Sequence, residues 1–143
     1  PGPLAGSADS PLMAALLPRI DIWSSNRAEA LQLTGTSQIA KALAQLESWL
    51  SPAVLLVLRD GPRGCWVSRQ GQAVQVPGFK VEAVDSNGAG DAHAGVLVAG
   101  LAAGLEPLMA ARRANAAAAI AVTRRGPATA PGSAEVDALL ARG

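Results

Sequence analysis

The most informative stretch of this sequence covers residues 84–95, and it reads Val84-Asp85-Ser86-Asn87-Gly88-Ala89-Gly90-Asp91-Ala92-His93-Ala94-Gly95. An apolar segment ends here, a polar turn follows, and the small residues that come next have a helical pattern. The first N–H groups of a helix lack intrahelical acceptors and lie at the positive end of its dipole. Glycines there let a ligand approach the backbone closely. The stretch therefore predicts an anion site at Gly88, Ala89 and Gly90, suited to a transferring phosphoryl group.

Asp91 allows two interpretations when only the residues are considered. A carboxylate in the first turn of a helix often does no more than stabilise the helix dipole, by about 0.3–1 kcal/mol. In a phosphate site it would repel the ligand, unless it faces an attacking hydroxyl and accepts its proton. A structural role and a catalytic base both stay open at this point, and the structural role is the more common one.

Helical and extended patterns alternate on both sides of this stretch. The aliphatic run 54–58 is typical of a buried parallel strand, and the segments 65–68 and 73–76 indicate a β-hairpin. A short strand is expected at 20–23 and an extended stretch at 81–84. Six helices are expected, at residues 12–17, 24/25/26–33, 36/37–50, 88–104, 106/107–122 and 133–140, where a slash separates alternative first residues. Ser133 is the expected N-cap of the last helix, and Thr36 or Ser37 that of the third. This alternation predicts an α/β fold with a mainly parallel sheet.

The composition narrows the classes of function. Lys plus Arg number 12 and Asp plus Glu number 11, and this balance gives no reason to expect nucleic acid or an anionic membrane as a partner. No uncharged apolar run reaches the length of about 18 residues that a membrane span needs. The single cysteine, Cys65, excludes an internal disulfide and is expected to be a buried structural thiol. The many alanines and glycines predict close packing between helices and sheet.

The beginning of the chain offers few signals. Residues 1–11 are rich in Pro, Gly and Ser and are expected to form a loop. The sequence opens with Pro1-Gly2-Pro3 and not with Met, so a targeting segment could precede it.

Residues 85–93 closely resemble the second signature of the ribokinase/PfkB family of carbohydrate kinases, usually Asp-Thr-Thr-Gly-Ala-Gly-Asp-x-Phe. Three further motifs occur in the family's order: Asn26-Arg27-Ala28-Glu29 for its Asn-x-x-Glu motif, residues 56–64 for its strand and Gly-x-x-Gly turn, and residues 115–126 for its late helix and the loop after it. The chain is therefore identified as a member of this family over nearly its whole length. The resemblance implies a three-layer ribokinase-like fold, with a mainly parallel central sheet plus a β-hairpin.

The resemblance also implies an activity, the transfer of the γ-phosphoryl group of ATP to an alcohol hydroxyl of a small carbohydrate. Asp91 would be the general base, and the backbone of Gly88, Ala89 and Gly90 would form the anion hole. The nucleotide and its Mg²⁺ would be held by matched positions: Asn26 and Glu29 for Mg²⁺ and phosphates through water, Arg59, Gly61 and Gly64 along the phosphates and ribose, and Asn115 near the adenine. From the residues alone, Asn26 and Glu29 would be an ordinary N-cap with its capping-box partner. A monovalent cation, K⁺, would lie between Asp85, the carbonyl of Asn87 and the loop 121–130.

Four positions depart from the family pattern. Arg59 stands where Thr is common, and its guanidinium can replace the lost hydroxyl contact to phosphate. Asn87 replaces Thr, and Ala130 falls where ribokinase offers a serine to the cation loop, so the cation site has the weaker support. His93 replaces Phe; it could touch nucleotide or substrate, but a packed histidine is the ordinary alternative.

Complete kinases of this family are considerably longer than this chain. Residues 1–143 are therefore expected to be the C-terminal ATP-binding and catalytic part, without the N-terminal half that carries the first signature, most sugar contacts and the lid. We expect a cytoplasmic enzyme that acts on a small-molecule sugar and forms a homodimer when full length.

The sequence leaves alternatives to a sugar kinase. The acceptor could be a nucleoside or a vitamin-like alcohol, or the protein could be a non-catalytic, nucleotide-binding regulatory relative of the same fold. A dinucleotide-binding enzyme is disfavoured, because Gly95 lies too far beyond Gly90 for that fingerprint and Asp91 would face a pyrophosphate.

Overall fold

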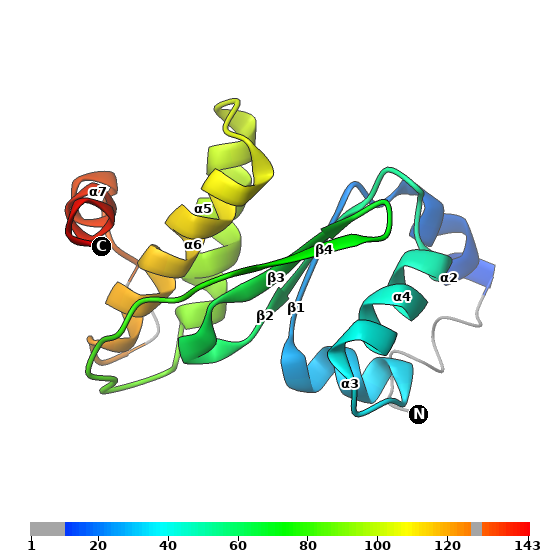
Figure 1. The fold of residues 1–143 in the computed structure, drawn as a ribbon, viewed down its shortest axis with the longest axis horizontal. Coiled ribbons are helices and arrows are strands. Elements are labelled where there is room, and N and C mark those ends of the chain that lie inside the picture. Colours follow the sequence, from blue (N-terminus) through cyan, green and yellow to red (C-terminus); the bar gives the residue numbers. More distant parts are fainter. Residues whose placement is uncertain (1–10, 127–129) are drawn as a thin grey trace. The chain divides into compact units, whose positions relative to one another are not determined.

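The computed structural model describes residues 11–126 and 130–143 (Figure 1). The chain forms two compact units. The first comprises the described residues up to Arg59 together with Trp66–Val74, and the second comprises Asp60–Cys65 together with the described residues from Gln75 to Gly143. The loop expected at 1–11 lies almost wholly outside the described residues.

The first unit alternates helices with strands. Its elements are α2 (Pro11–Leu16), the 3-10 turn η1 (Leu17–Arg19), β1 (Ile22–Asn26), α3 (Arg27–Thr34), α4 (Ile39–Trp49) and β2 (Leu55–Arg59), and the hairpin strands β3 (Cys65–Arg69) and β4 (Gln72–Val76) run through both units. β1 and β2 are parallel, with Trp23 opposite Leu56 and Asn26 opposite Arg59. The strand order is β1-β2-β3-β4. These strands confirm the expected α/β fold with parallel strands and a hairpin.

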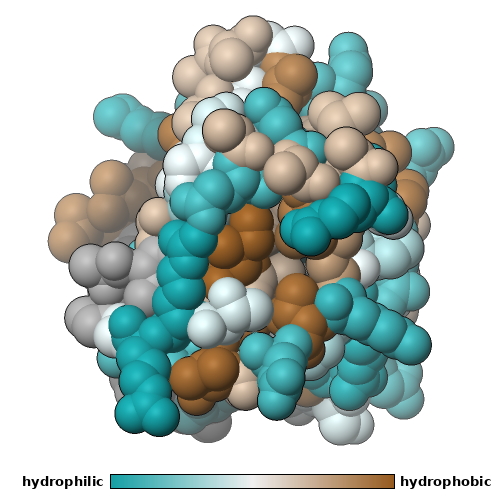
Figure 2. All heavy atoms as spheres, turned by 90° about the vertical axis from the view of Figure 1, so that its left-hand side faces the viewer, coloured by the Kyte–Doolittle hydropathy of each residue, from teal (hydrophilic) through white to brown (hydrophobic). Residues whose placement is uncertain are grey.

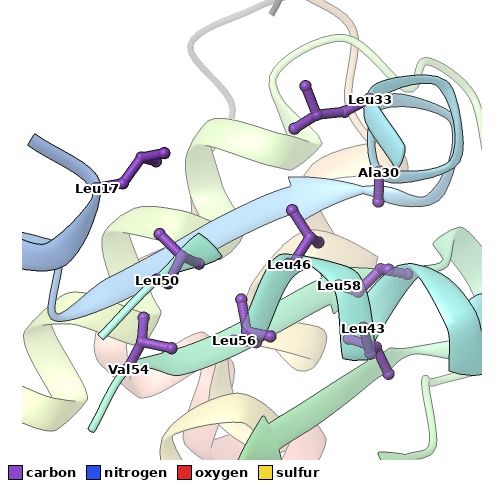
Figure 3. Packing of buried hydrophobic residues seen from close by; sticks show 9 residues of the cluster. All are labelled: Leu17, Ala30, Leu33, Leu43, Leu46, Leu50, Val54, Leu56 and Leu58. Carbon is purple, nitrogen blue, oxygen red and sulfur yellow. The ribbon is translucent and has the colours of Figure 1, made fainter. Parts of the chain in front are cut away.

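The core of the first unit consists of aliphatic side chains from its helices and from β2. α4 presents Leu43 and Leu46 from one face, and Leu56 and Leu58 alternate along β2 toward the same cluster. Figure 3 shows the nine buried residues: Leu17, Ala30, Leu33, Leu43, Leu46, Leu50, Val54, Leu56 and Leu58. Burying apolar area is the main stabilising contribution to such a unit, and here it fixes β1 and β2 beneath α3 and α4.

The second unit is built on three helices, α5 (Ala89–Ala102), α6 (Pro107–Val122) and α7 (Ser133–Arg142), with the 3-10 turn η2 (Gly61–Arg63). α5 and α6 lie side by side (Figure 1). They approach closely because their contact residues are small: a Cβ added to Gly100 would lie 3.2 Å from the Cβ of Ala110. α6 buries Ala110, Ala111, Ala114, Ala116 and Ala117 completely. The alanine and glycine content predicted close packing of helices on the sheet; in this unit, the small side chains bring two helices together.

α7 is attached to α6 by a buried contact and by an ion pair. Val136 packs against Ala116 and Ala117, and Arg113 pairs with Asp137 at 2.5 Å. The prediction that Ser133 caps α7 is wrong: Gly132 is the N-cap, and Ser133 Oγ accepts a hydrogen bond from Arg113 instead.

On the face drawn in Figure 2, hydrophobic side chains gather between hydrophilic ones.

Two further expectations need correction. α4 has Gln38 as its N-cap without a side-chain cap bond, so neither Thr36 nor Ser37 caps it. Thr36 Oγ1 accepts the N–H of Gln38 instead. The extended stretch 81–84 forms no strand; instead the N–H groups of Val84 and Asp85 both donate to the carbonyl of Val122. Among the described residues, no helix is both long enough and apolar enough to cross a membrane.

Candidate active site

α5 begins where the glycine-rich stretch predicts the start of a helix. Gly88 is the N-cap with φ 84°, a left-handed conformation that strains any other residue. Its carbonyl accepts the first intrahelical bond, from the N–H of Ala92 at 3.0 Å. The N–H of Ala89 bonds to the carbonyl of Ser86 at 3.3 Å. The N–H groups of Gly90 and Asp91 precede the first intrahelical donor, so they are the ones best placed to bind an anion.

Asp91 lies in the first turn of α5 and is exposed. α5 has no side-chain cap hydrogen bond, so Asp91 does not close a capping box there. Within the described residues, its carboxylate makes no hydrogen bond or ion pair. This leaves the carboxylate accessible to a ligand bound at the helix start.

Asp85 ties the turn before α5 to the loop after α6. Its Oδ1 accepts the N–H of Asn87 at 2.9 Å, and its Oδ2 accepts the N–H of Gly126 at 3.1 Å. These two bonds, that from Asn87 foremost, hold the pKa of the Asp85 carboxyl below its ordinary value. Part of the predicted cation loop, residues 127–129, lies outside the described residues.

The turn Gly61–Arg63 is closely packed against the segment that follows β4. Gly64 has φ 99°, and a Cβ added to it would collide with the backbone of Val76 and Pro77. The N–H of Gly78 donates to the carbonyl of Arg63 at 3.1 Å. Glycine at position 64 is therefore required both by conformation and by space.

Asn115 lies on α6 and is only 4% exposed. Its Nδ2 donates to the carbonyl oxygens of Val76 at 3.0 Å and Pro77 at 3.1 Å. Its Oδ1 lies 2.9 Å from Nε2 of His93, a residue of α5 that is 3% exposed. The amide expected near adenine is thus bonded within the protein. His93 is a packed histidine, the ordinary alternative.

Three other predicted residues come together in the first unit. Asn26 caps α3 through a reciprocal capping box, with Glu29 N to Asn26 Oδ1 at 2.8 Å and Asn26 N to Glu29 Oε2 at 3.0 Å. Arg59 lies opposite Asn26 in the parallel register, and its Nη2 is 3.9 Å from Glu29 Oε2. The Nε of Arg59 is buried without a hydrogen-bond partner among the described residues. A guanidinium has only donors, and it can donate charge-assisted hydrogen bonds to an anionic ligand.

The first unit also has a concavity beside this group. It has a volume of about 420 Å³ and is lined by Ile20, Ile22, Trp23, Ser24, Ser25, Glu29 and Leu33. No group of three or more His, Cys, Asp or Glu side chains that could hold a metal is found in the described part of the chain.

The bond between His93 and Asn115 was missed by reasoning from the sequence. The available signal was the presence of one histidine and one asparagine on helices otherwise built of small apolar residues. Buried polar side chains need partners, but the sequence alone does not say that these two face each other across α5 and α6.

The sequence is similar to a family of carbohydrate kinases. The profile described as pfkB family carbohydrate kinase matches residues 4–133. The uncharacterized sugar kinase YegV of Escherichia coli (strain K12) is 33% identical over 132 residues, which are 91% of this chain and 41% of that protein.

Solved structures show the same similarity. The ribokinase of Arabidopsis thaliana, complexed with ribose and ATP, superposes with a TM-score of 0.81 at 28% identity, over 92% of this chain and 44% of that one. The fructokinase of Vibrio cholerae O395, bound to fructose, ADP and a calcium ion, gives a TM-score of 0.80 at 30% identity, over 90% and 43%. The chain thus has the ribokinase-like fold and spans less than half the length of these proteins.

Proposed function

The chain belongs to the pfkB family of carbohydrate kinases, and from this premise we propose that the full-length protein transfers the γ-phosphoryl group of ATP to an alcohol hydroxyl of a small sugar. The observation that carries the proposal is the start of α5, where Gly88 in a left-handed conformation is followed by an exposed carboxylate at Asp91. A relative solved with ribose and ATP supports a sugar acceptor and this nucleotide.

In the proposed mechanism, Asp91 accepts the proton of the attacking hydroxyl as its oxygen bonds to the γ-phosphorus. The bond between that phosphorus and the bridging oxygen of ADP breaks in the same step, and ADP leaves. General base catalysis of this kind contributes about 10²–10⁴-fold to a rate. The backbone at Gly88, Ala89 and Gly90 forms the anion hole, in which the N–H groups of Gly90 and Asp91 carry most of the stabilisation because that of Ala89 already bonds to Ser86. The positive end of the α5 dipole adds to the same effect.

We assign Asn26, Glu29 and Arg59 to the phosphates and their metal ion. A magnesium ion keeps several water ligands and is usually held by one or two carboxylates together with substrate phosphates. Glu29, with its side chain 55% exposed, fits that requirement. When bound, Mg²⁺ neutralises charge on the phosphates. Arg59 supplies a guanidinium whose buried Nε has no partner within the described residues.

The remaining assignments follow the same premise. Gly61 and Gly64 bring their backbone close to the phosphates and ribose. Asn115 shapes the adenine region through Val76 and Pro77, because its amide is bonded to their carbonyl groups. We keep K⁺ beside Asp85 and the carbonyl of Asn87 as a separate proposal, tested by exchanging K⁺ for Na⁺ in the assay.

The proposal is tested by a phosphotransfer assay of the full-length protein with ATP against a panel of sugars, nucleosides and vitamin-like alcohols. We expect sugar-dependent formation of ADP and of a phosphorylated sugar. Phosphorylation of a nucleoside alone would reassign the substrate class. ATP binding without transfer to any acceptor would favour the non-catalytic regulatory relative and contradict the proposal.

A further inference from the structure

A buried chain of hydrogen bonds in the second unit connects two backbone elements that the proposed function assigns to the nucleotide. It begins at His93, which lies on α5 just beyond Asp91 and is 3% exposed. Nε2 of His93 is 2.9 Å from Oδ1 of Asn115, which is itself 4% exposed. Asn115 then donates to the carbonyl groups of Val76 and Pro77. α5 and the segment after β4 are thus joined through α6.

The bonds of Asn115 determine the state of the histidine. Nδ2 is the only donor atom of the asparagine side chain, and it donates to two carbonyl groups, so Oδ1 can only accept. His93 must therefore carry a proton on Nε2 to make the bond. A side chain without a donor at this place would leave Oδ1 buried with one partner fewer, and burial of an unsatisfied acceptor is unfavourable.

The segment at the other end of the chain of bonds is fixed to the glycine turn. Gly78 donates its N–H to the carbonyl of Arg63 at 3.1 Å. The backbone of Val76 and Pro77 fills the space where a side chain of residue 64 would be. Displacement of the segment 76–78 would therefore move the turn Gly61–Arg63 with it.

We infer that His93 is a positioning residue: through Asn115 and the segment 76–78, it sets the start of α5, with Asp91, relative to the turn Gly61–Arg63. The inference rests on the proposed function for its kinetic consequence, but not for its geometry. Phosphoryl transfer depends on such positioning, because small displacements of reacting groups cause large losses of rate. The phenylalanine of the family pattern would fill the same volume without donating to Asn115.

Two substitutions in the full-length protein separate positioning from packing. His93→Gln keeps a nitrogen donor, whereas His93→Phe fills the site and cannot donate. We expect His93→Phe to lower kcat/KM for ATP about tenfold, which corresponds to about 1.4 kcal/mol. We expect kcat/KM of His93→Gln to stay within about threefold of the wild-type value. Equal kinetics in both variants, whether both normal or both impaired, would overturn the inference.

Two measurements on the same proteins do not depend on activity. Nitrogen NMR of His93 should show a proton on Nε2, and hydrogen exchange at the N–H of Gly78 should become faster in His93→Phe but not in His93→Gln. An unprotonated Nε2, or unchanged exchange at Gly78, would contradict the inference. A wild-type protein without phosphotransfer would contradict the proposed function alone, and these two readouts would still decide the role of His93.

Discussion

The thiol of Cys65 is fully buried in the second unit. Burial raises its pKa from 9.0 to about 11, and a hydrogen bond with Asn115 opposes part of the rise. The thiolate is the reactive form, so at pH 8 we expect iodoacetamide to label this cysteine slowly in the folded protein and rapidly after denaturation. Peptide-level mass spectrometry measures the difference, with Cys65→Ala as the unlabelled control. Equal labelling before and after denaturation would show that the thiol is accessible.

The same pKa predicts a dependence of stability on pH. The folded thiol loses its proton near pH 11, whereas an unfolded one loses it near 9.0. As the pH rises above about 9, the unfolded chain ionises first, and the folded state becomes less stable relative to it. Thermal denaturation should therefore show a steeper loss of stability between pH 9 and 11 in the wild type than in Cys65→Ala. Parallel curves would contradict the raised pKa.

At the scale of residues, the sequence predicted the capping box of Asn26 and Glu29 and a helix start at Gly88, because both depend on local backbone rules. It could not identify the partners of His93 and Asn115, which are 22 residues apart and meet only when α5 packs on α6. For Ser133, the sequence predicted a local role that a tertiary contact replaces. Serine is a favoured N-cap residue, but the hydroxyl of Ser133 accepts a hydrogen bond from Arg113 of another helix.

At the scale of elements, the helices and strands could be predicted to within a few residues. Hydrophobic periodicity indicates which face of an element is buried, and glycine and proline mark where elements end. β2 and the hairpin followed from aliphatic runs between turns. The segment 81–84 has extended composition, but it forms no strand, since its N–H groups meet the end of α6 and not a neighbouring strand. Pairing of this kind depends on tertiary contacts that local patterns do not contain.

The start of α3 allows a test of metal binding with little change in fold. In Glu29→Gln, the amide can still accept the N–H of Asn26, so the capping box and the stability of α3 should be nearly preserved. The charge that would hold hydrated Mg²⁺ is lost. We therefore expect the full-length protein to need several-fold more Mg²⁺ for half-maximal activity, with Glu106→Gln as a control at an exposed carboxylate. An unchanged Mg²⁺ titration would leave Asn26 and Glu29 with a capping role alone.

At the scale of the whole molecule, the chain spans less than half the length of the related sugar kinases. Among the described residues, β1 is at the edge of the sheet, and an unprotected edge strand promotes association. Residues 1–143 expressed alone should therefore be poorly soluble or oligomeric, bind ATP weakly and phosphorylate no sugar, because the groups that orient an acceptor supply much of the catalysis. Light scattering and a phosphotransfer assay beside the full-length protein test this. Comparable turnover by residues 1–143 would place the acceptor site within them.

We propose above all that Asp91 is the catalytic base of a phosphotransferase. The most direct measurement compares the turnover of full-length wild type and Asp91→Asn with ATP and the best acceptor of the panel. Asparagine keeps the shape of the side chain but cannot accept the proton. We expect kcat to fall by about 10²–10⁴-fold, with ATP affinity nearly unchanged. Turnover close to wild type in Asp91→Asn would contradict the account and return this carboxylate to a structural role at the start of α5.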